Sequence, residues 1–242
     1  MTRLVRGELL KIWTTRSLLL LTLLSVAFGF LGVVTMIVSG GRAGSLGSID
    51  PRSFATLGAT AYIFAGALGV ICIANEGRHN TADHTYLATP RRSRVVLAKL
   101  AATIVTSMFI GVLTEAAIFA LGLPWLAAKG LHLGFGAATW WDIAGQILGI
   151  ALIGALGVAV GGIIRNQVAG IIVVVAWLLI AEGALSLLLP GAGRFLPARG
   201  LVSGLAGDSS LVPRWDGAVL LLAYLAGLGG FAAWLIERRD IA

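Results

Sequence analysis

The sequence has few charged residues and almost no cysteine. Asp, Glu, Lys and Arg make up only 12% of its 242 residues, where a soluble domain carries roughly a quarter, and the mean hydropathy is +0.94. The single cysteine, Cys72, excludes an internal disulfide and a site built from several cysteines. The three histidines, His79, His84 and His132, do not have the spacing of a metal site. These shortages exclude a soluble globular domain and favour a polytopic membrane protein.

The sequence also lacks the motifs of several enzyme classes. It has no Gly-x-x-x-x-Gly-Lys-Ser/Thr phosphate loop, so the chain is not expected to bind and hydrolyse ATP itself. No Ser, His and acid arrangement indicates an intramembrane hydrolase. The formal charge of +7 comes from basic residues at the ends of apolar segments rather than on one folded face. Anionic lipid headgroups, and not nucleic acid, are therefore the expected partners of these charges.

Long apolar segments dominate what is present. A helix needs about 20 apolar residues to cross ~30 Å of hydrocarbon. Six segments meet that length, and they are residues 18–38, 54–74, 95–122, 143–164, 168–189 and 218–236. The sequence therefore predicts an all-α protein with six transmembrane helices in residues 18–242, preceded by a separate amino-terminal helix in residues 1–17.

Basic residues orient these spans. With the amino terminus inside, twelve of the 18 Lys and Arg residues fall on the cytoplasmic side and six outside. An excess of Lys and Arg in short loops marks the cytoplasmic side. We therefore expect both termini, Arg91, Arg165 and Arg238 to be cytoplasmic, and Gly130 and Gly207 to be external.

The amino-terminal segment predicts an interfacial helix. Its apolar residues Leu4, Val5, Leu9, Ile12 and Trp13 share one side of a helical wheel, with Arg3, Arg6 and Lys11 on the other. Glu8 lies within the apolar half and needs a basic partner, for which Arg3, Lys11 and the arginines of residues 75–99 are candidates. A signal peptide is the competing interpretation, but residues 18–38 exceed a signal h-region and lack a small-x-small cleavage site.

Residues 75–99 form the longest polar break and predict a short cytoplasmic helix. Residues 81–88 contain no Gly or Pro, Asn80 can cap their start, and Pro90 prevents continuation. A solvated, positively charged topology signal is the alternative interpretation of this loop.

These features resemble the ABC-2 type permeases, the membrane subunits of bacterial ABC exporters. The order Glu76, Arg78, Thr81, Leu87, Pro90, Arg91 is similar to their first cytoplasmic loop, although Gly77 and Asn80 replace a usual aromatic and glycine. The amino-terminal Arg-x-Glu-Leu-x-Lys, with Glu8 and Lys11, resembles their elbow helix. The tight turn at Arg165 and the order Trp177, Glu182, Pro190 are similar too.

The resemblance implies a type V exporter fold and a separate ATPase. In that family the short cytoplasmic helix, called the coupling helix, docks on two copies of an ATPase subunit, which bind ATP and magnesium. A second copy of the chain or a related permease completes the pathway, and the location is the bacterial plasma membrane. The implied coupling residues are Glu76, Arg78, Thr81, Asp83, Thr85, Leu87, Pro90, Arg91 and Arg165.

Two acidic residues lie inside apolar segments and are the candidate pathway residues. Counted along their spans at 1.5 Å per residue, Glu115 and Glu182 both fall in the outer half of the membrane and could be near one another. An acid at that depth generally faces a cavity or the protein interior. Each carboxyl therefore lines the pathway or holds helices together through hydrogen bonds, with Thr114 or Ser186 as candidate partners.

Two further segments carry packing signals. Gly145, Gly149, Gly157 and Gly161 predict close approach of another helix, from this chain or from a second protomer. Residues 190–215 are rich in Pro and Gly yet partly apolar, and are expected to lie along or dip into the outer leaflet. A secondary transporter, a channel and a non-transporting sensor accessory remain as alternative functions.

Overall fold

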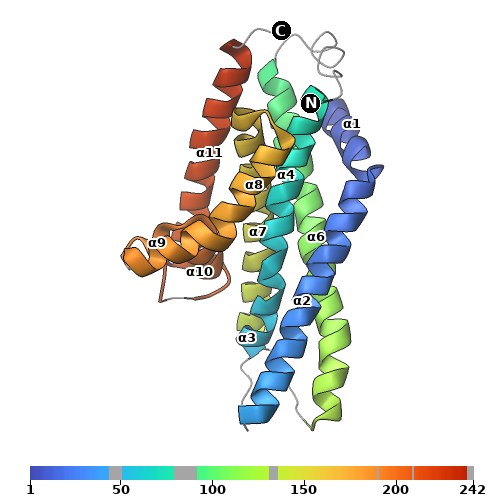
Figure 1. The fold of residues 1–242 in the computed structure, drawn as a ribbon, viewed down its shortest axis with the longest axis vertical. Coiled ribbons are helices and arrows are strands. Elements are labelled where there is room, and N and C mark those ends of the chain that lie inside the picture. Colours follow the sequence, from blue (N-terminus) through green and yellow to red (C-terminus); the bar gives the residue numbers. More distant parts are fainter. Residues whose placement is uncertain (44–50, 79–91, 131–135, 190, 209, 239–242) are drawn as a thin grey trace.

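The computed structural model describes residues 1–43, 51–78, 92–130, 136–189, 191–208 and 210–238, and all regular structure within them is helical (Figure 1). The first half contains α1 (Thr2–Trp13), α2 (Arg16–Ala43), α3 (Pro51–Ala55), the 3₁₀ helix η2 (Thr56–Thr60), α4 (Ala61–Arg78) and α6 (Arg92–Ala128). The second half contains α7 (Ala137–Ile164), α8 (Gln167–Ala176), the π-helical η3 (Trp177–Ala181), α9 (Glu182–Leu188), the 3₁₀ helix η4 (Gly193–Phe195), the π-helical η5 (Pro197–Val202), α10 (Ser203–Leu205) and α11 (Arg214–Arg238).

The six predicted spans are confirmed by length and composition. The structure has six helical segments long and apolar enough to cross a membrane: Arg16–Ser39, Ser53–Ala74, Arg94–Ala128, Ala137–Ile164, Gln167–Leu188 and Arg214–Arg238. The third is longer than expected, because α6 continues through Pro124, where the sequence predicted an end at residue 122. Membrane helices tolerate such a proline because neighbouring groups can satisfy the freed backbone carbonyl.

The helix α7 forms the centre of the bundle. It contacts α4, α6, α8 and α11, and 72% of the residues in its most apolar 18-residue segment are buried. The corresponding segments of α2, of the span Gln167–Leu188 that begins with α8, and of α11 are only 22%, 17% and 22% buried. The apolar outer faces of these three helices are therefore the surfaces available to lipid or to another protein chain.

Glycines set the close approach of α7 to its neighbours. A Cβ on Gly157 would meet the backbone of Gly66 in α4, and one on Gly145 would meet the carbonyl of Leu205 in α10. A Cβ on Gly149 would lie 2.7 Å from a methyl group of Val202. The glycine face of α7 therefore packs within the chain, which was one of the two alternatives that the sequence left open.

The connections follow local chemistry at two places. Arg165, with φ of 57°, ends α7 in the left-handed region, and the Asn166 side chain caps α8 by accepting from the backbone N–H of Ala169 at 3.0 Å. This geometry confirms the tight turn predicted between the fourth and fifth spans. At the chain start, Thr14 and Thr15 join α1 to α2, and α1 lies at the same end of the bundle as the end of α11 (Figure 1).

The segment after α9 packs back onto the bundle. Its short helices η5 and α10 contact α7 and α11, and Figure 1 shows α9 and α10 partway along the long helices α2 and α6 rather than beyond their ends. Ala198, Leu201, Val202 and Leu205 of this segment are buried in the core. Its apolar composition therefore serves packing against α7 and α11.

Candidate functional site

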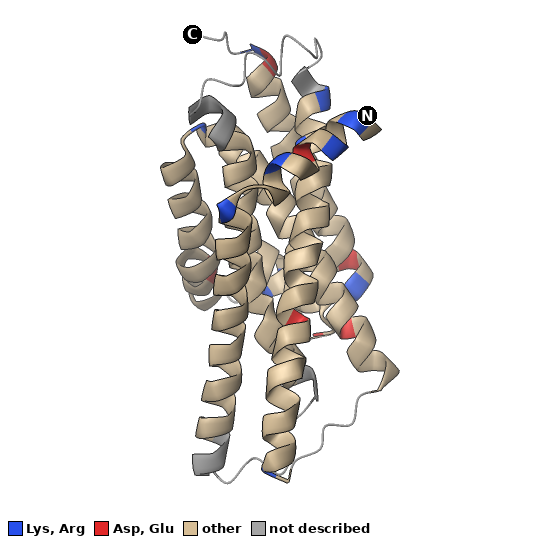
Figure 2. Ribbon diagram, turned by 90° about the vertical axis from the view of Figure 1, so that its right-hand side faces the viewer, with Lys and Arg blue, Asp and Glu red and all other residues tan. Residues whose placement is uncertain are grey.

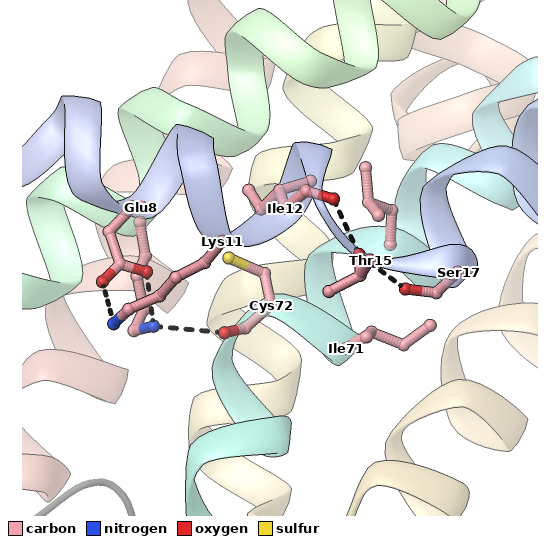
Figure 3. A pocket seen from close by; sticks show the side chains of 9 residues that line it. Glu8, Lys11, Ile12, Thr15, Ser17, Ile71 and Cys72 are labelled. Carbon is pink, nitrogen blue, oxygen red and sulfur yellow. Dashed lines mark hydrogen bonds and ion pairs between the residues drawn. The ribbon is translucent and has the colours of Figure 1, made fainter.

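The carboxylate of Glu8 is the centre of a buried ionic cluster at the amino-terminal end of the bundle. Glu8 on α1 accepts from the Lys11 ammonium through Oε1 and from the Lys99 ammonium of α6 through Oε2, each at 2.8 Å. The Lys99 ammonium also donates to the carbonyl oxygen of Cys72 in α4 at 3.2 Å (Figure 3). The Glu8 cluster, defined by these four residues, therefore ties α1 to both α4 and α6.

Two ammonium groups neutralise Glu8 and explain why this carboxylate can be buried. Burial opposes the charged form of Glu8, but the Lys99 ammonium and the Lys11 ammonium together hold its pKa below the usual 4.5. The Lys99 side chain is only 2% exposed, whereas that of Lys11 is 52% exposed. Lys99 is therefore the buried counter-ion, and Lys11 assists from the surface.

The cavity beside this cluster is small. Its volume is ≈ 70 Å³, and its walls are completed by Ile12, Thr15, Ser17, Leu68 and Ile71 (Figure 3). Pockets for drug-sized ligands measure roughly 300–1,000 Å³, while a water needs only about 10–15 Å³ of such space. The Glu8 cluster is therefore suited to positioning α1 and not to holding a substrate.

The sequence identified only part of this cluster. Lys11 was among the expected partners of Glu8, and the structure confirms it. Arg3 was another, but it is exposed, and the buried partner is Lys99, which was not among the candidates. Lys99 is 91 residues from Glu8, so no local pattern could pair them.

Most of the predicted coupling residues lie outside the described part. Residues 79–91 are not described, and neither are the side chains of Glu76 and Arg78. The range 79–91 contains the predicted coupling residues Thr81, Asp83, Thr85, Leu87, Pro90 and Arg91. Arg165 is described, and it is exposed at the turn between α7 and α8. Figure 2 shows Lys and Arg residues gathered at the end of the bundle that holds the amino terminus.

Glu115 is buried between α6, α7 and η2. It is 3% exposed, and its Oε1 accepts from the Nε2 amide of Gln146, which also donates to the carbonyl of Ala55 at 3.2 Å. Gly58 makes room, because a Cβ there would collide with this carboxylate. The Oε2 atom is buried without a hydrogen-bond partner among the described residues. Thr114 is not its partner, because that hydroxyl pairs with Ser25 at 2.7 Å.

Glu182 holds the segment after α9 in place. Its side chain is fully buried, and its carboxylate accepts from the backbone N–H groups of Ala198, at 3.0 and 3.1 Å, and of Arg199, at 2.7 Å. Ser186 does not bond this carboxylate, since its hydroxyl donates to the backbone carbonyl of Glu182. The carboxylate thus links the π-helical break in the fifth span to the start of η5.

A polar cavity lies between Gln146, the partner of Glu115, and Ala198, a partner of Glu182. Its volume is ≈ 360 Å³, within the range of small-molecule sites. It is lined by Ser53, Thr56, Ala59, Tyr62, Gln146, Ala198, Val202, Ser203, Ala206, Gly207, Asp208 and Ser210. Glu115 and Glu182 have different partners. Gln146 donates to Glu115, the backbone N–H of Ala198 donates to Glu182, and both of these donor residues line the cavity.

A third acid, which the sequence did not single out, lies near the same cavity. Asp142 of α7 is 2% exposed and forms an ion pair with Arg214 at the start of α11. Gly207, with φ of 94°, lies so close to the Asp142 carboxylate that a Cβ there would collide with it. The positive φ and the close approach both require glycine at this position. Asp142 and Arg214 are 72 residues apart in the sequence, and no sequence pattern predicts a pair at such a separation.

Among the residues that the structure describes, no three His, Cys, Asp or Glu side chains gather as a metal-binding group. Comparison of the chain with models of protein families finds no match, and comparison with curated proteins finds none either.

Proposed function

We propose that this chain is the membrane subunit of an ATP-binding cassette exporter of the ABC-2 type. Two such subunits, identical or related, form the substrate pathway in a bacterial plasma membrane, and two separate ATPase subunits with ATP and magnesium dock at the amino-terminal end. The six-span all-helical bundle, with a separate helix before the first span, is the architecture that this role needs.

One observation carries the proposal: α1 is tied to both helices that flank residues 79–91. The Lys99 ammonium of α6 donates both to the Glu8 carboxylate of α1 and to the Cys72 carbonyl of α4. A partner that pushes on residues 79–91 therefore acts on α4, α6 and α1 as one unit. This rigidity is what a docking segment needs if it is to move the spans rather than bend alone.

The helix α6 extends this connection into the bundle. It is continuous from Arg92 to Ala128 and carries both Lys99 and Glu115. These residues are 16 positions apart, which corresponds to ~24 Å at 1.5 Å per residue. A displacement of the docking segment is thereby carried to Glu115 and its partner Gln146, which lines the polar cavity. Rocking of α6 would open this cavity alternately to the two sides of the membrane.

Copurification tests the proposal. If an ABC ATPase is encoded beside this chain, the tagged full chain expressed with it should retain that ATPase on an affinity column. Leu87→Asp should release the ATPase, because a charge without a partner replaces an apolar anchor in the interface. Leu87→Met keeps an apolar side chain and serves as the matched control. Equal retention of the ATPase by the parent and both variants would support the alternative interpretation, in which residues 75–99 are only a topology signal.

A self-sufficient secondary transporter is the second candidate. It is favoured by the π-helical break at η3, which ends at the buried acid Glu182, since interrupted helices form the sites of many secondary transporters. Transport driven by an imposed ion gradient, in vesicles that contain only this chain, would support this candidate. Transport that requires both the ATPase and ATP would exclude it.

A further inference from the structure

An apolar groove lies on the outside of the bundle between α8 and α11. Its volume is ≈ 460 Å³, within the roughly 300–1,000 Å³ of small-molecule sites. The floor and walls are formed by Ile153 and Leu156 of α7, Val174 of α8, Leu178 of η3, and Tyr224 and Leu228 of α11. Among the described residues, no charged side chain lines it. The groove therefore suits an apolar occupant.

A second cavity with charged walls adjoins the groove. Its volume is ≈ 490 Å³, and it is lined by Arg194 of η4 and Asp216 of α11. Phe195 lines this cavity, and its carbonyl accepts from the Tyr224 hydroxyl at 3.4 Å, so the two residues form the boundary with the apolar groove. The Arg194 guanidinium lies 4.7 Å from the centre of the Phe195 ring. A cation and an anion thus stand at one end of an apolar groove.

The two cavities lie along one stripe of α11. Asp216, Leu220, Tyr224 and Leu228 are spaced by four residues, so each lies beside the next on the helix surface, in a stripe that turns gradually around the helix. The 12 residues from the first to the last span ~18 Å, close to the ~15 Å of hydrocarbon in one leaflet. Trp215, which is 80% exposed, stands at the start of α11, where an aromatic residue marks the membrane–water interface. The charged end is therefore at headgroup level, and the apolar end reaches toward the middle of the membrane.

We propose that this groove binds one phospholipid with an amine headgroup. Arg194 takes the phosphate, Asp216 takes the ammonium group, and one acyl chain lies in the groove between α8 and α11. The pair of opposite charges selects this class, because the carboxylate of Asp216 would repel a headgroup that carries only negative charge. The proposal requires a membrane-spanning chain but no ATPase partner, so it stands independently of the exporter role.

Native mass spectrometry of the purified full chain tests the proposal. The chain is reconstituted in nanodiscs with equal amounts of phosphatidylethanolamine, phosphatidylcholine and phosphatidylglycerol, and the lipids that it retains on release are identified. We expect one retained phosphatidylethanolamine. Arg194→Gln should lower this retention about tenfold, as expected for the loss of one charge-assisted hydrogen bond. Arg238→Gln, an exposed arginine at the opposite end of α11, is the control that should leave retention unchanged.

Two further variants separate headgroup selection from chain binding. Asp216→Asn should reduce phosphatidylethanolamine and increase phosphatidylglycerol, because the repulsion of the anionic headgroup is removed. Leu228→Trp should fill the groove and abolish retention of any lipid, whereas Leu222→Trp, at an exposed position outside the groove, should not. The exposed Arg194 and Asp216 variants keep the test valid if Leu228→Trp does not fold.

Two results would overturn the proposal. One is equal retention of the three lipids by the parent, Arg194→Gln and Asp216→Asn, which would mean that the groove holds lipid without selecting its headgroup. The other is a parent that retains no lipid but is a dimer, with Leu228→Trp a monomer in the same spectra. In that case the groove would be an interface with a second copy of the chain.

Discussion

At the scale of single residues, three buried acids in the described part of the chain have specific partners. Glu8 is matched by Lys99, Asp142 by Arg214, and Glu182 by two backbone N–H groups. A buried acid is costly unless it is paired or hydrogen-bonded. Each of these pairs joins two elements, so these residues fix the positions of helices relative to one another.

The first prediction concerns the Glu8 cluster. Lys99→Met keeps the length of the side chain but leaves the buried Glu8 carboxylate with the half-exposed Lys11 as its one counter-ion among the described residues. We expect the free energy of unfolding to fall by about 3 kcal/mol, the lower end of the range for breaking a buried pair. Lys11→Met, the control, should cost less than about 1 kcal/mol because its charge is largely solvated. Thermal unfolding in detergent measures both, and equal costs would contradict the assignment.

Acid should weaken the same cluster. The pKa of Glu8 is below 4.5 in the folded chain, so its ion pairs add stability above pH 4.5, and this contribution is lost as the pH falls through the folded pKa. The difference in unfolding temperature between the parent and Glu8→Gln should therefore be constant from pH 7 to about pH 5 and shrink below 4.5. A difference that does not change down to pH 3 would contradict a charged Glu8.

The two candidate pathway acids should respond differently to neutralisation. Glu182→Gln replaces a carboxylate that accepts from two backbone N–H groups by an amide with one acceptor, so we expect a loss of about 1–3 kcal/mol in stability. Glu115→Gln keeps the volume and can still bond Gln146, so it should unfold like the parent. If Glu115 lines the pathway, this variant should export cationic dyes from cells more slowly than the parent does, and the export of neutral dyes should change less. Parent-like export of both kinds of dye would remove Glu115 from the pathway.

At the scale of elements, the fit of α4 against α7 depends on glycine in both helices. A Cβ on Gly69 of α4 would collide with the carbonyl of Gly154 and lie 2.7 Å from the backbone nitrogen of Val158. Backbone atoms cannot turn aside as side chains can, so the helices would have to move apart. Small residues are the usual means of bringing membrane helices this close.

Gly69→Ala should therefore destabilise the bundle. We expect a loss of about 1–3 kcal/mol from overpacking, despite the better helix propensity of alanine. Gly230→Ala in α11 is the matched control, because nothing lies within 4 Å of a Cβ at that position. Unfolding temperatures in detergent compare the two variants. A Gly69→Ala variant as stable as the parent would show that α4 and α7 are more loosely packed than described.

At the scale of the whole molecule, the positions of the ends can be tested by labelling. In a Cys72→Ala background, cysteines at Arg3 and Arg238 should react with a membrane-impermeant maleimide only after intact cells are permeabilised. Cysteines at Lys129 and Ser210 should react in intact cells. The basic residues at the amino-terminal end predict this orientation. Labelling of position 238 in intact cells would reverse it, and labelling of positions 3 and 238 from opposite sides would contradict an even number of spans.

The sequence alone determined the number of spans and their approximate positions. The length of each apolar run set the six spans, and Arg165 with Asn166 set the turn between two of them, because such signals act within a few residues along the chain. It also indicated that Glu8 needs a basic partner, since an acid in an apolar face is visible in a helical pattern.

Only the tertiary structure decided which groups meet. Glu8 and Lys99 are 91 residues apart, Asp142 and Arg214 are 72 apart, and Glu115 and Gln146 are 31 apart. Each partner is set by which faces of α1, α6, α7 and α11 turn toward one another. The polar cavity and the α11 groove likewise form from segments distant in sequence, so their shape follows from packing between helices and not from any local pattern.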